Sequence, residues 1–259
     1  MAENVRYEQE GPVVTITLTR PEVHNCVDGA TAAALHAAWT RFRDDDAALV
    51  AILTGAGASF SSGADLKAAH TLGPQGDALD PAFVFSGAGY LGFTRLTDIF
   101  KPTIAAVAGH CLAGGLEMAC WCDIRLAAED AVFGCAERRW GVPLVDGGTQ
   151  RLPRILGWGR GLDLILTGRT LDAAQALAWG LVSEVVPRDE LLPRARALAA
   201  RIARYPQGAL RTDKQAAVRG WGLPLEEALR VECQLGMPHI TSAEMAEGLR
   251  RFRERELES

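Results

Sequence analysis

The chain has 259 residues, of which 48% are hydrophobic and 23% are charged. A chain of this size can bury a substantial core, and we expect one main domain over residues 1–195 followed by a helical region over residues 196–259. The formal net charge is -5 and only three lysines occur, so the composition excludes sequence-independent binding of nucleic acid through a basic face.

Predicted strands and helices alternate along the N-terminal half of the chain. Residues 13–18 are β-branched and alternate in polarity, which predicts a strand that a proline ends. Asp28 is expected to cap an amphipathic helix that continues to about Arg43. The short apolar run over residues 49–53 predicts a buried strand, and a glycine-containing turn follows it.

The second half continues this alternation and ends in helices. Residues 73–92 are rich in glycine and proline, which predicts a loop or broken helices beside an opening. Further strands are expected over residues 104–107, 124–127 and 182–186, and further helices over residues 116–122, 149–156 and 172–179. From Glu190 the pattern is helical, with apolar faces that have little core left to meet, so we expect this tail to pack on a neighbouring subunit. The alternation indicates an α/β fold.

Cysteine spacing and residue composition argue against a disulfide scaffold, a metal site and a membrane partner. The six cysteines form no CxxC pair, and neither His110-Cys111 nor Cys120-x-Cys122 has the spacing of zinc ligands. The apolar stretch at residues 102–128 contains four ionisable side chains and a glycine pair, so we expect strand, turn, helix and strand instead of a membrane span. The N-terminus lacks the apolar core of a secretory signal, and we expect a cytoplasmic protein.

Glu117 is the strongest chemical signal in the sequence. It follows a Gly114-Gly115 pair and begins an otherwise apolar helix, where the burial of an unpaired carboxylate is unfavourable. Either a function offsets that cost, or Glu117 closes on the backbone amides of its own first helical turn as a capping residue. The residue types alone leave these two interpretations open.

Two glycine-containing loops are candidates for binding negative charge. Gly114-Gly115 opens a helix, and residues 62–66 follow a strand and precede an expected helix capped by Asp65. Each loop by itself is explained equally well as a tight turn. Together they suit an oxyanion hole, which needs N–H donors that converge from separate segments.

Glu137 is a second acidic candidate, a few residues after a predicted short strand. A surface salt bridge to Arg138 or Arg139 is the default explanation for a glutamate in this setting. The residue types alone favour that explanation.

Four segments resemble the enoyl-CoA hydratase/isomerase (crotonase) superfamily. They are residues 61–67 (SSGADLK), 101–109 (KPTIAAVAG), 113–119 (AGGLEMA) and 147–152 (GGTQRL), and the similarity covers nearly the whole chain in order. The resemblance implies an α/β spiral of repeated ββα units with a C-terminal helical trimerisation region, in a homo-trimer or a hexamer. It also implies an acyl-CoA thioester as substrate and neither a metal nor a redox cofactor.

The resemblance extends to individual residues. Ala64 and Gly114 occupy the two oxyanion-hole positions, whose N–H groups bind the thioester oxygen. The positions that match CoA-binding segments are Glu22, Val23, His24, Asp65, Leu66 and Lys67, with Phe252 and Arg255 on a tail helix that often belongs to a neighbouring subunit.

In hydratases of this superfamily two glutamates twenty residues apart hold the water, and Glu117 and Glu137 have this spacing. Addition of water across an α,β-double bond needs a base and an acid, so we expect Glu117 to activate water and Glu137 to protonate Cα. The leading hypothesis is therefore an enoyl-CoA hydratase. An isomerase or another enolate-forming reaction is the alternative within the superfamily, and a non-catalytic acyl-CoA binding protein is the alternative of another class.

The loop after Glu137 departs from the usual hydratase pattern. Val145 stands where a glycine usually leaves room beside the water, and Ala136 replaces the customary proline. Asp146 adds a third carboxylate. It is either an additional acid or the cap of the helix that begins near Gly148, and the cap is the favoured interpretation.

Acyl-chain specificity is expected to come from residues 68–95 and from two tryptophans. The candidate pocket walls are Phe83, Phe85, Tyr90, Phe93, Trp121 and Trp140, although aromatic side chains more often belong to the core. A nicotinamide-binding loop at residues 55–57 is disfavoured because the third glycine of that fingerprint is missing. A Ser-His-Asp hydrolase is disfavoured because no serine stands in a G-x-S-x-G elbow.

Overall fold

The structure is a computed structural model that describes residues 4–72 and 87–258, with side chains up to residue 254. The strands are β1 (Val5–Glu10), β2 (Val13–Leu18), β3 (Val50–Gly55), β4 (Thr103–Val107), β5 (His110–Leu112), β6 (Ile124–Ala128), β7 (Val132–Gly134), β8 (Thr170–Asp172) and β9 (Glu184–Val186). The α-helices are α1 (Gly29–Asp44), α3 (Gly114–Trp121), α4 (Gly148–Leu156), α5 (Trp158–Thr167), α6 (Ala173–Trp179), α7 (Leu191–Ala203), α8 (Gln207–Gly220), α9 (Leu225–Ile240) and α10 (Ala243–Glu258). Short 3-10 helices are η1 (Pro21–Val23), η2 (Leu66–Thr71), η3 (Ala136–Trp140) and η4 (Arg188–Glu190).

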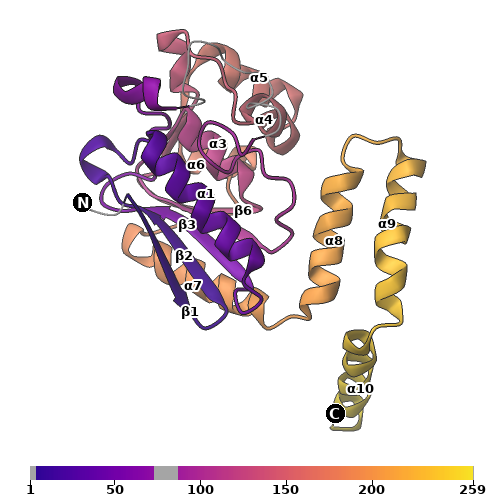
Figure 1. The fold of residues 1–259 in the computed structure, drawn as a ribbon. Helices are drawn as coiled ribbons and strands as arrows, with labels where there is room; N and C mark the ends of the chain where they lie inside the picture. The colour runs from indigo at the N-terminus through magenta and orange to yellow at the C-terminus, as the bar shows by residue number, and fades with distance from the viewer. Residues whose placement is uncertain (1–3, 73–86, 259) are drawn as a thin grey trace.

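A six-stranded sheet forms the centre of the molecule, with strand order β1-β2-β3-β4-β6-β9. β1 pairs with β2 in antiparallel orientation, and the other neighbours are parallel. In β3, Ala51 and Leu53 share a core with α1, whereas Val50 and Ile52 share a second core with α7. Because helices cover both faces (Figure 1), β3 is buried continuously from Val50 to Thr54 and not at alternate positions.

Helix α1 begins where the sequence predicted a capped helix. The carboxylate of Asp28 accepts hydrogen bonds from the Thr31 N–H (2.8 Å) and the Thr31 hydroxyl (2.7 Å). Leu35, Trp39 and Phe42, which share one face of the helix, are fully buried. The predicted cap and amphipathic face of α1 are therefore both confirmed.

A smaller three-stranded sheet, with order β5-β7-β8, lies next to the central one and positions the candidate site. β5 and β7 are parallel, and β8 is antiparallel to β7. Helix α3 follows β5 after one residue, and η3 follows β7 after one residue. The segments after these two neighbouring strands therefore leave the small sheet at the same edge.

The boundary predicted at residue 195 falls inside α7. Ala195, Leu198, Ala199 and Ile202 of this helix are buried against the central sheet, so the core continues to Ala203. Beyond it, α8 and α9 pair with each other beside the core, and α10 lies at the end of that pair where α8 begins and α9 ends (Figure 1). No helix in the described part of the chain is both long enough and apolar enough to cross a membrane.

Candidate active site

The two candidate glutamates follow neighbouring parallel strands. Leu112 of β5 lies opposite Gly134 of β7. Glu117 comes five residues after Leu112, in α3, and Glu137 comes three residues after Gly134, in η3. Because parallel strands end at the same edge of a sheet, the fold delivers both carboxyl groups to one place. Both side chains are buried, at 4% and 5% exposure respectively.

The loops that hold Ala64 and Gly114 are in direct contact. A Cβ atom on Gly63 would lie 2.5 Å from the backbone N of Gly114, and a Cβ atom on Gly114 would lie 3.5 Å from the backbone N of Ala64. Gly63 also has a φ of +85°, so both space and conformation require glycine there. Within the described residues, the N–H groups of Ala64 and Gly114 donate to no acceptor. Two adjacent N–H donors from separate segments are thus available to a ligand oxygen.

Backbone strain occurs directly before the second of these loops. Ala113, the N-cap of α3, has a φ of 51°, although it is not a glycine. Its N–H donates to the Gly134 carbonyl oxygen (2.9 Å), which ties this turn to the end of β7. A left-handed non-glycine residue costs about 1–3 kcal/mol and is typical of functional turns. The turn leaves the N-terminus of an α-helix facing the Ala64 loop.

Glu117 is held by backbone donors from the loop before α4. Its Oε1 accepts hydrogen bonds from the Gly148 N–H (2.7 Å) and the Asp146 N–H (3.0 Å). These donors do not belong to the first turn of α3, so of the two interpretations left open for Glu117 the structure excludes the one in which it caps its own helix. Burial is the largest cause, and the negative charge of Asp146 the second, of a rise in the pKa of Glu117 to about 8. The hydrogen bonds from the two N–H donors lower this pKa and so oppose the rise.

This raised pKa makes the free energy of unfolding depend on pH. In the unfolded chain Glu117 loses its proton near its ordinary pKa of 4.5, whereas the folded chain retains the proton up to about 8. Stability from this group is therefore complete below 4.5 and declines as pH rises toward 8. In Glu117→Gln the amide oxygen keeps both N–H donors and no proton is lost. We expect this variant to gain stability over the parent protein by about 1.4 kcal/mol per pH unit inside that window.

Chemical denaturation of both proteins at several pH values measures this gain. Glu129→Gln, which changes an exposed glutamate, is the matched control and should follow the parent protein at every pH. A stability difference between Glu117→Gln and the parent that does not grow with pH would contradict the burial of a protonated Glu117.

Glu137 is buried without hydrogen-bond partners. Neither of its carboxyl oxygens accepts a hydrogen bond within the described residues, and its one ion pair there is to Arg138, whose Nε lies 3.5 Å from Oε1. The default explanation is a surface salt bridge. The ion pair to Arg138 is present, but Glu137 is buried and only the arginine is partly exposed. Burial raises the pKa of Glu137, and the guanidinium of Arg138 opposes that shift. An unsatisfied buried carboxyl requires an explanation, and a ligand or a reacting water supplies one.

Asp146 does not cap α4. The N-cap position belongs to Gly147, which has no side-chain cap, and the Asp146 carboxylate turns to residues far earlier in the chain. Its Oδ1 accepts hydrogen bonds from the Thr94 hydroxyl and from the Leu91 N–H. The favoured interpretation of Asp146 as a helix cap is wrong.

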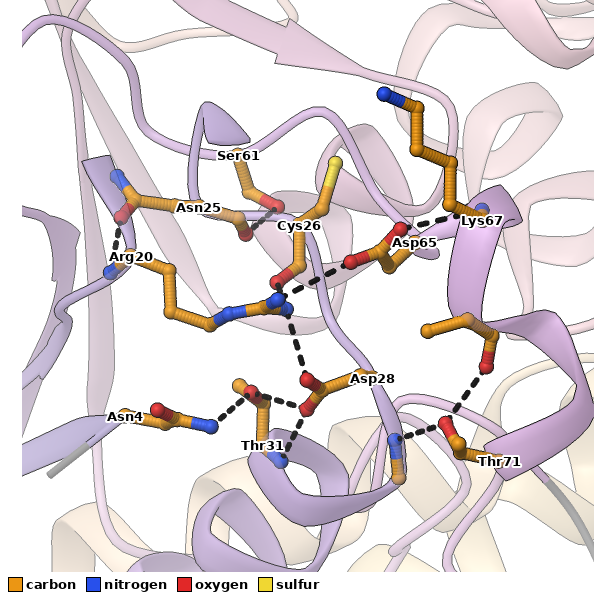
Figure 2. Close-up of polar contacts among 12 residues, drawn as sticks. Asn4, Arg20, Asn25, Cys26, Asp28, Thr31, Ser61, Asp65, Lys67 and Thr71 are labelled. Atoms are coloured by element: carbon orange, nitrogen blue, oxygen red, sulfur yellow. Dashed lines mark hydrogen bonds and ion pairs between the residues drawn. The ribbon is translucent and has the colours of Figure 1, made fainter. Parts of the chain in front are cut away.

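An arginine joins two of the segments that match CoA-binding positions (Figure 2). The Arg20 guanidinium forms ion pairs with Asp28 (3.2 Å) and Asp65 (3.1 Å) and donates to the Cys26 carbonyl oxygen (2.7 Å). Asp65 also accepts from the Lys67 N–H (3.2 Å), as expected for a residue that begins a helical turn. The chain segments around residues 26 and 65 are thus fixed relative to each other.

The remaining predicted CoA-binding side chains of the core lie at the surface of this network. Glu22, His24, Leu66 and Lys67 are exposed, and Val23 is half-buried. Figure 2 shows the Lys67 ammonium group extending away from the arginine network. His24 Nδ1 lies 3.1 Å from the Ser59 hydroxyl oxygen, which holds an exposed His110 on its other side (3.2 Å).

The tail residues are not part of this site in a single chain. Helix α10, which contains Phe252, lies away from α3 and the central sheet (Figure 1), and Phe252 is 60% exposed. The side chain of Arg255 is outside the described residues. A role for either residue at the CoA site requires a neighbouring subunit.

The aromatic side chains differ from the pocket walls that the sequence suggested. Phe93 is fully buried and stacks on Trp39 (5.2 Å between ring centroids), with Trp121 packed against both rings, so these residues belong to the core. Trp140 is exposed at the surface, whereas Tyr90 is half-buried next to Leu91. Phe83 and Phe85 lie outside the described residues. The core explanation thus applies to Phe93, whereas Trp121 both packs against the core and lines a cavity between α4 and α8.

A cavity of about 930 Å³ opens between α4 and α8, and neither candidate glutamate lines it. Val145 and Gly147 do line it, from the side of the loop that holds Glu117. No group of three or more metal-ligating side chains suited to an ion occurs among residues 4–72 and 87–254. The candidate site is consequently identified by its carboxyl groups and free N–H donors and not by the size of a cavity.

The sequence profile described as Enoyl-CoA hydratase/isomerase matches residues 8–258. The probable enoyl-CoA hydratase echA8 of Mycobacterium bovis is 38% identical over 255 residues, which cover 98% of this chain and 96% of that protein. The carnitinyl-CoA dehydratase of Salmonella arizonae is 39% identical over 231 residues, with 89% and 86% covered. The mevalonyl-coenzyme A hydratase sidH of Aspergillus fumigatus is 40% identical over 217 residues, with 83% and 78% covered.

A solved structure agrees with these sequence matches. The crystal structure of enoyl-CoA hydratase EchA1 from Mycobacterium marinum superposes on this chain with a TM-score of 0.89 at 35% identity. The superposition covers 98% of this chain and 97% of that one. The arrangement of sheets and helices is therefore shared over the full length, including the C-terminal helices.

Proposed function

The chain belongs to the enoyl-CoA hydratase/isomerase (crotonase) superfamily, and we propose that it adds water across the double bond of an α,β-unsaturated acyl-CoA. The observation that supports this reaction most strongly is a pair of buried carboxyl groups, Glu117 and Glu137, at the edge where two free N–H donors meet. Three relatives named as CoA hydratases or dehydratases, at 38% to 40% identity, support water addition or removal as the reaction class.

The proposed mechanism uses each group once. The N–H groups of Ala64 and Gly114 bind the thioester oxygen, where negative charge develops when Cβ is attacked. The ionised form of Glu117, which becomes populated as the pH approaches its pKa of about 8, takes a proton from water as the water oxygen bonds to Cβ, and the Cα=Cβ electron pair moves to form the enolate. Protonated Glu137 then gives its proton to Cα, and the thioester carbonyl is restored. One proton enters and one leaves the carboxyl pair, so the net reaction adds only water.

Absorbance of the conjugated enoyl thioester tests the proposal directly. We expect purified protein to remove that absorbance with at least one member of a panel of short, medium and aromatic enoyl-CoAs. Formation of the 3-hydroxyacyl-CoA, measured by mass spectrometry as a gain of one water, identifies the product. Absence of both changes for the whole panel would refute the hydratase proposal while leaving the family assignment intact.

Lys67 offers a specific test of the CoA-binding segment. Its exposed ammonium group, at the rim of the network that Arg20 organises, is suited to a CoA phosphate. We expect Lys67→Met to raise KM for an enoyl-CoA on the order of fivefold, as for an exposed ion pair. The matching thioester of pantetheine, which lacks the nucleotide phosphates, is the control substrate. An equal loss with both substrates would contradict a phosphate contact.

We also propose that the protein assembles as a homo-trimer or as a hexamer of two trimers. Large apolar side chains of α8, α9 and α10 and their connections are exposed in the single chain, namely Val218, Trp221, Leu223, Leu225, Leu229, Met237, Ile240, Leu249 and Phe252. Apolar surface on this scale indicates a protein partner. Light scattering is expected to give three or six times the 27.7 kDa chain mass, and a monomeric mass would exclude the assembly.

A further inference from the structure

Asp146 connects two parts of the site that are far apart in the sequence. Its side chain is almost fully buried, at 3% exposure. Its own N–H donates to Glu117 Oε1 (3.0 Å), so the residue supplies one of the two backbone donors that hold the proposed base. Its carboxylate points to the segment over residues 88–95, where Oδ1 meets the Leu91 N–H (3.3 Å) and the Thr94 hydroxyl.

Two arginines strengthen the same connection. Arg95 donates twice to the Val145 carbonyl oxygen, from Nε (3.1 Å) and Nη2 (2.6 Å). Arg151 of α4 donates to the Asp146 carbonyl oxygen (2.9 Å) and to the Thr94 carbonyl oxygen (2.6 Å). The loop over residues 144–148 and the segment over residues 88–95 are therefore joined through both side chains and backbone.

The segment that Asp146 anchors reaches the oxyanion-hole side of the site. Leu91 is fully buried, and its Cδ1 would lie 2.8 Å from a Cβ atom on Gly114, so its side chain packs directly on that glycine. Gly89, with a φ of +90°, approaches Asp146 so closely that a Cβ atom would lie 2.6 Å from Oδ1. The carboxylate of Asp146 thus holds Leu91 against Gly114, while the backbone N–H of the same residue holds Glu117.

We infer that Asp146 is a positioning residue for the proposed reaction and not a third proton donor. Asp146 joins two segments. One is the 144–148 loop, whose N–H groups orient Glu117, and the other is the 88–95 segment, whose Leu91 covers Gly114. This inference rests on the proposed hydratase function. Asp146 contrasts with Glu137, whose oxygens accept no hydrogen bond within the described residues, because Asp146 Oδ1 already accepts from two donors.

The carboxylate also acts on Glu117 through its charge. Ionisable groups near Glu117 come from five segments: Asp146 before α4, Glu137 of η3, Arg151 of α4, and the thiols of Cys120 in α3 and Cys135 after β7. After burial, the charge of Asp146 is the largest of these influences on the pKa of Glu117, and it acts upward. Removal of that charge should make Glu117 ionise at lower pH.

Asp146→Asn and Asp146→Ala separate the two contributions. Asparagine keeps an acceptor for Leu91 and Thr94 but lacks the charge, whereas alanine loses both. We expect Asp146→Asn to keep kcat within about tenfold of the parent and to lower the pH at which Glu117 ionises by about one unit. We expect Asp146→Ala to lose a further tenfold or more, since Leu91 and the 144–148 loop lose their anchor.

The ionisation of Glu117 is measured without substrate, from the pH dependence of the stability difference between each protein and its Glu117→Gln counterpart. Asp123→Asn is the control, because Asp123 also accepts from a threonine hydroxyl (Thr103, 2.9 Å) but lies beyond the other end of α3. It should leave the Glu117 midpoint unchanged.

Two results would overturn the inference. Loss of activity in Asp146→Asn equal to that in Glu117→Gln would make Asp146 a proton donor. An unmoved Glu117 midpoint together with full activity of Asp146→Ala would remove any positioning role. Should the parent protein hydrate no enoyl-CoA, the hydratase proposal fails, but the substrate-free midpoint still decides whether Asp146 acts on Glu117.

Discussion

Replacing Glu117 with glutamine is expected to lower kcat for hydration by about 10³-fold, within the range of general acid–base catalysis. The amide oxygen can still accept from the Asp146 and Gly148 N–H groups, so the 144–148 loop keeps its position. The amide cannot take a proton from water, and this step alone is removed. The dissociation constant for a CoA thioester is expected to stay within about twofold, because binding uses the Ala64 and Gly114 donors.

Stopped-flow absorbance gives kcat, and isothermal titration with a saturated acyl-CoA gives the dissociation constant. Glu129→Gln is the matched control, since it makes the same chemical change on an exposed glutamate next to β6 and should keep full activity. Retention of more than a tenth of the parent kcat in Glu117→Gln would exclude Glu117 as the water-activating base.

Glu137→Gln is expected to lower hydration by about 10²- to 10⁴-fold, because the enolate then lacks its proton donor at Cα. The variant should fold at least as well as the parent, since within the described residues Glu137 loses no hydrogen bond and only a 3.5 Å ion pair to the partly exposed Arg138, and its burial as a carboxylate is unfavourable. Activity and thermal unfolding together therefore separate a chemical role from a structural one.

The same variant distinguishes a hydratase from its nearest alternatives. A double-bond isomerase that moves one proton with a single base would lose much less activity in Glu137→Gln than in Glu117→Gln. If the protein only binds acyl-CoA, then the parent, Glu117→Gln and Glu137→Gln should all bind thioesters, and none of the three should convert them to product. Equal and large losses in both variants, with binding retained, are the result that the carboxyl pair predicts.

The pattern of buried strands and capped helices could be predicted from the sequence. Asp28 and the apolar face of α1, and the short apolar runs of β3 and β4, are local signals that the tertiary structure reinforces. β1 and α5 were missed for physical reasons. β1 is a polar edge strand, and α5 contains Gly159 and Gly161, whose low helix propensity hides it. Gly161 is needed because a Cβ there would lie 2.6 Å from Pro153 of α4.

The members of the site could be named from the sequence, but their partners could not. Glu117, Glu137 and the glycines near Ala64 and Gly114 stand in motifs with a family resemblance. The hydrogen bonds of Glu117 and Asp146 cross 29 and 55 residues of chain respectively, and no local pattern encodes such contacts. Local capping rules offered partners for Glu117 and Asp146 that differ from those in the structure. The burial of Glu137 became visible only in the folded chain.

A crystal structure with a bound acyl-CoA thioester tests the central claim most directly. The claim predicts the thioester oxygen at about 3 Å from the backbone N of both Ala64 and Gly114, and one water in contact with Glu117 and Glu137 near Cβ. A thioester oxygen bound away from these two N–H groups, or a Glu137 carboxyl turned away from that water, would contradict it.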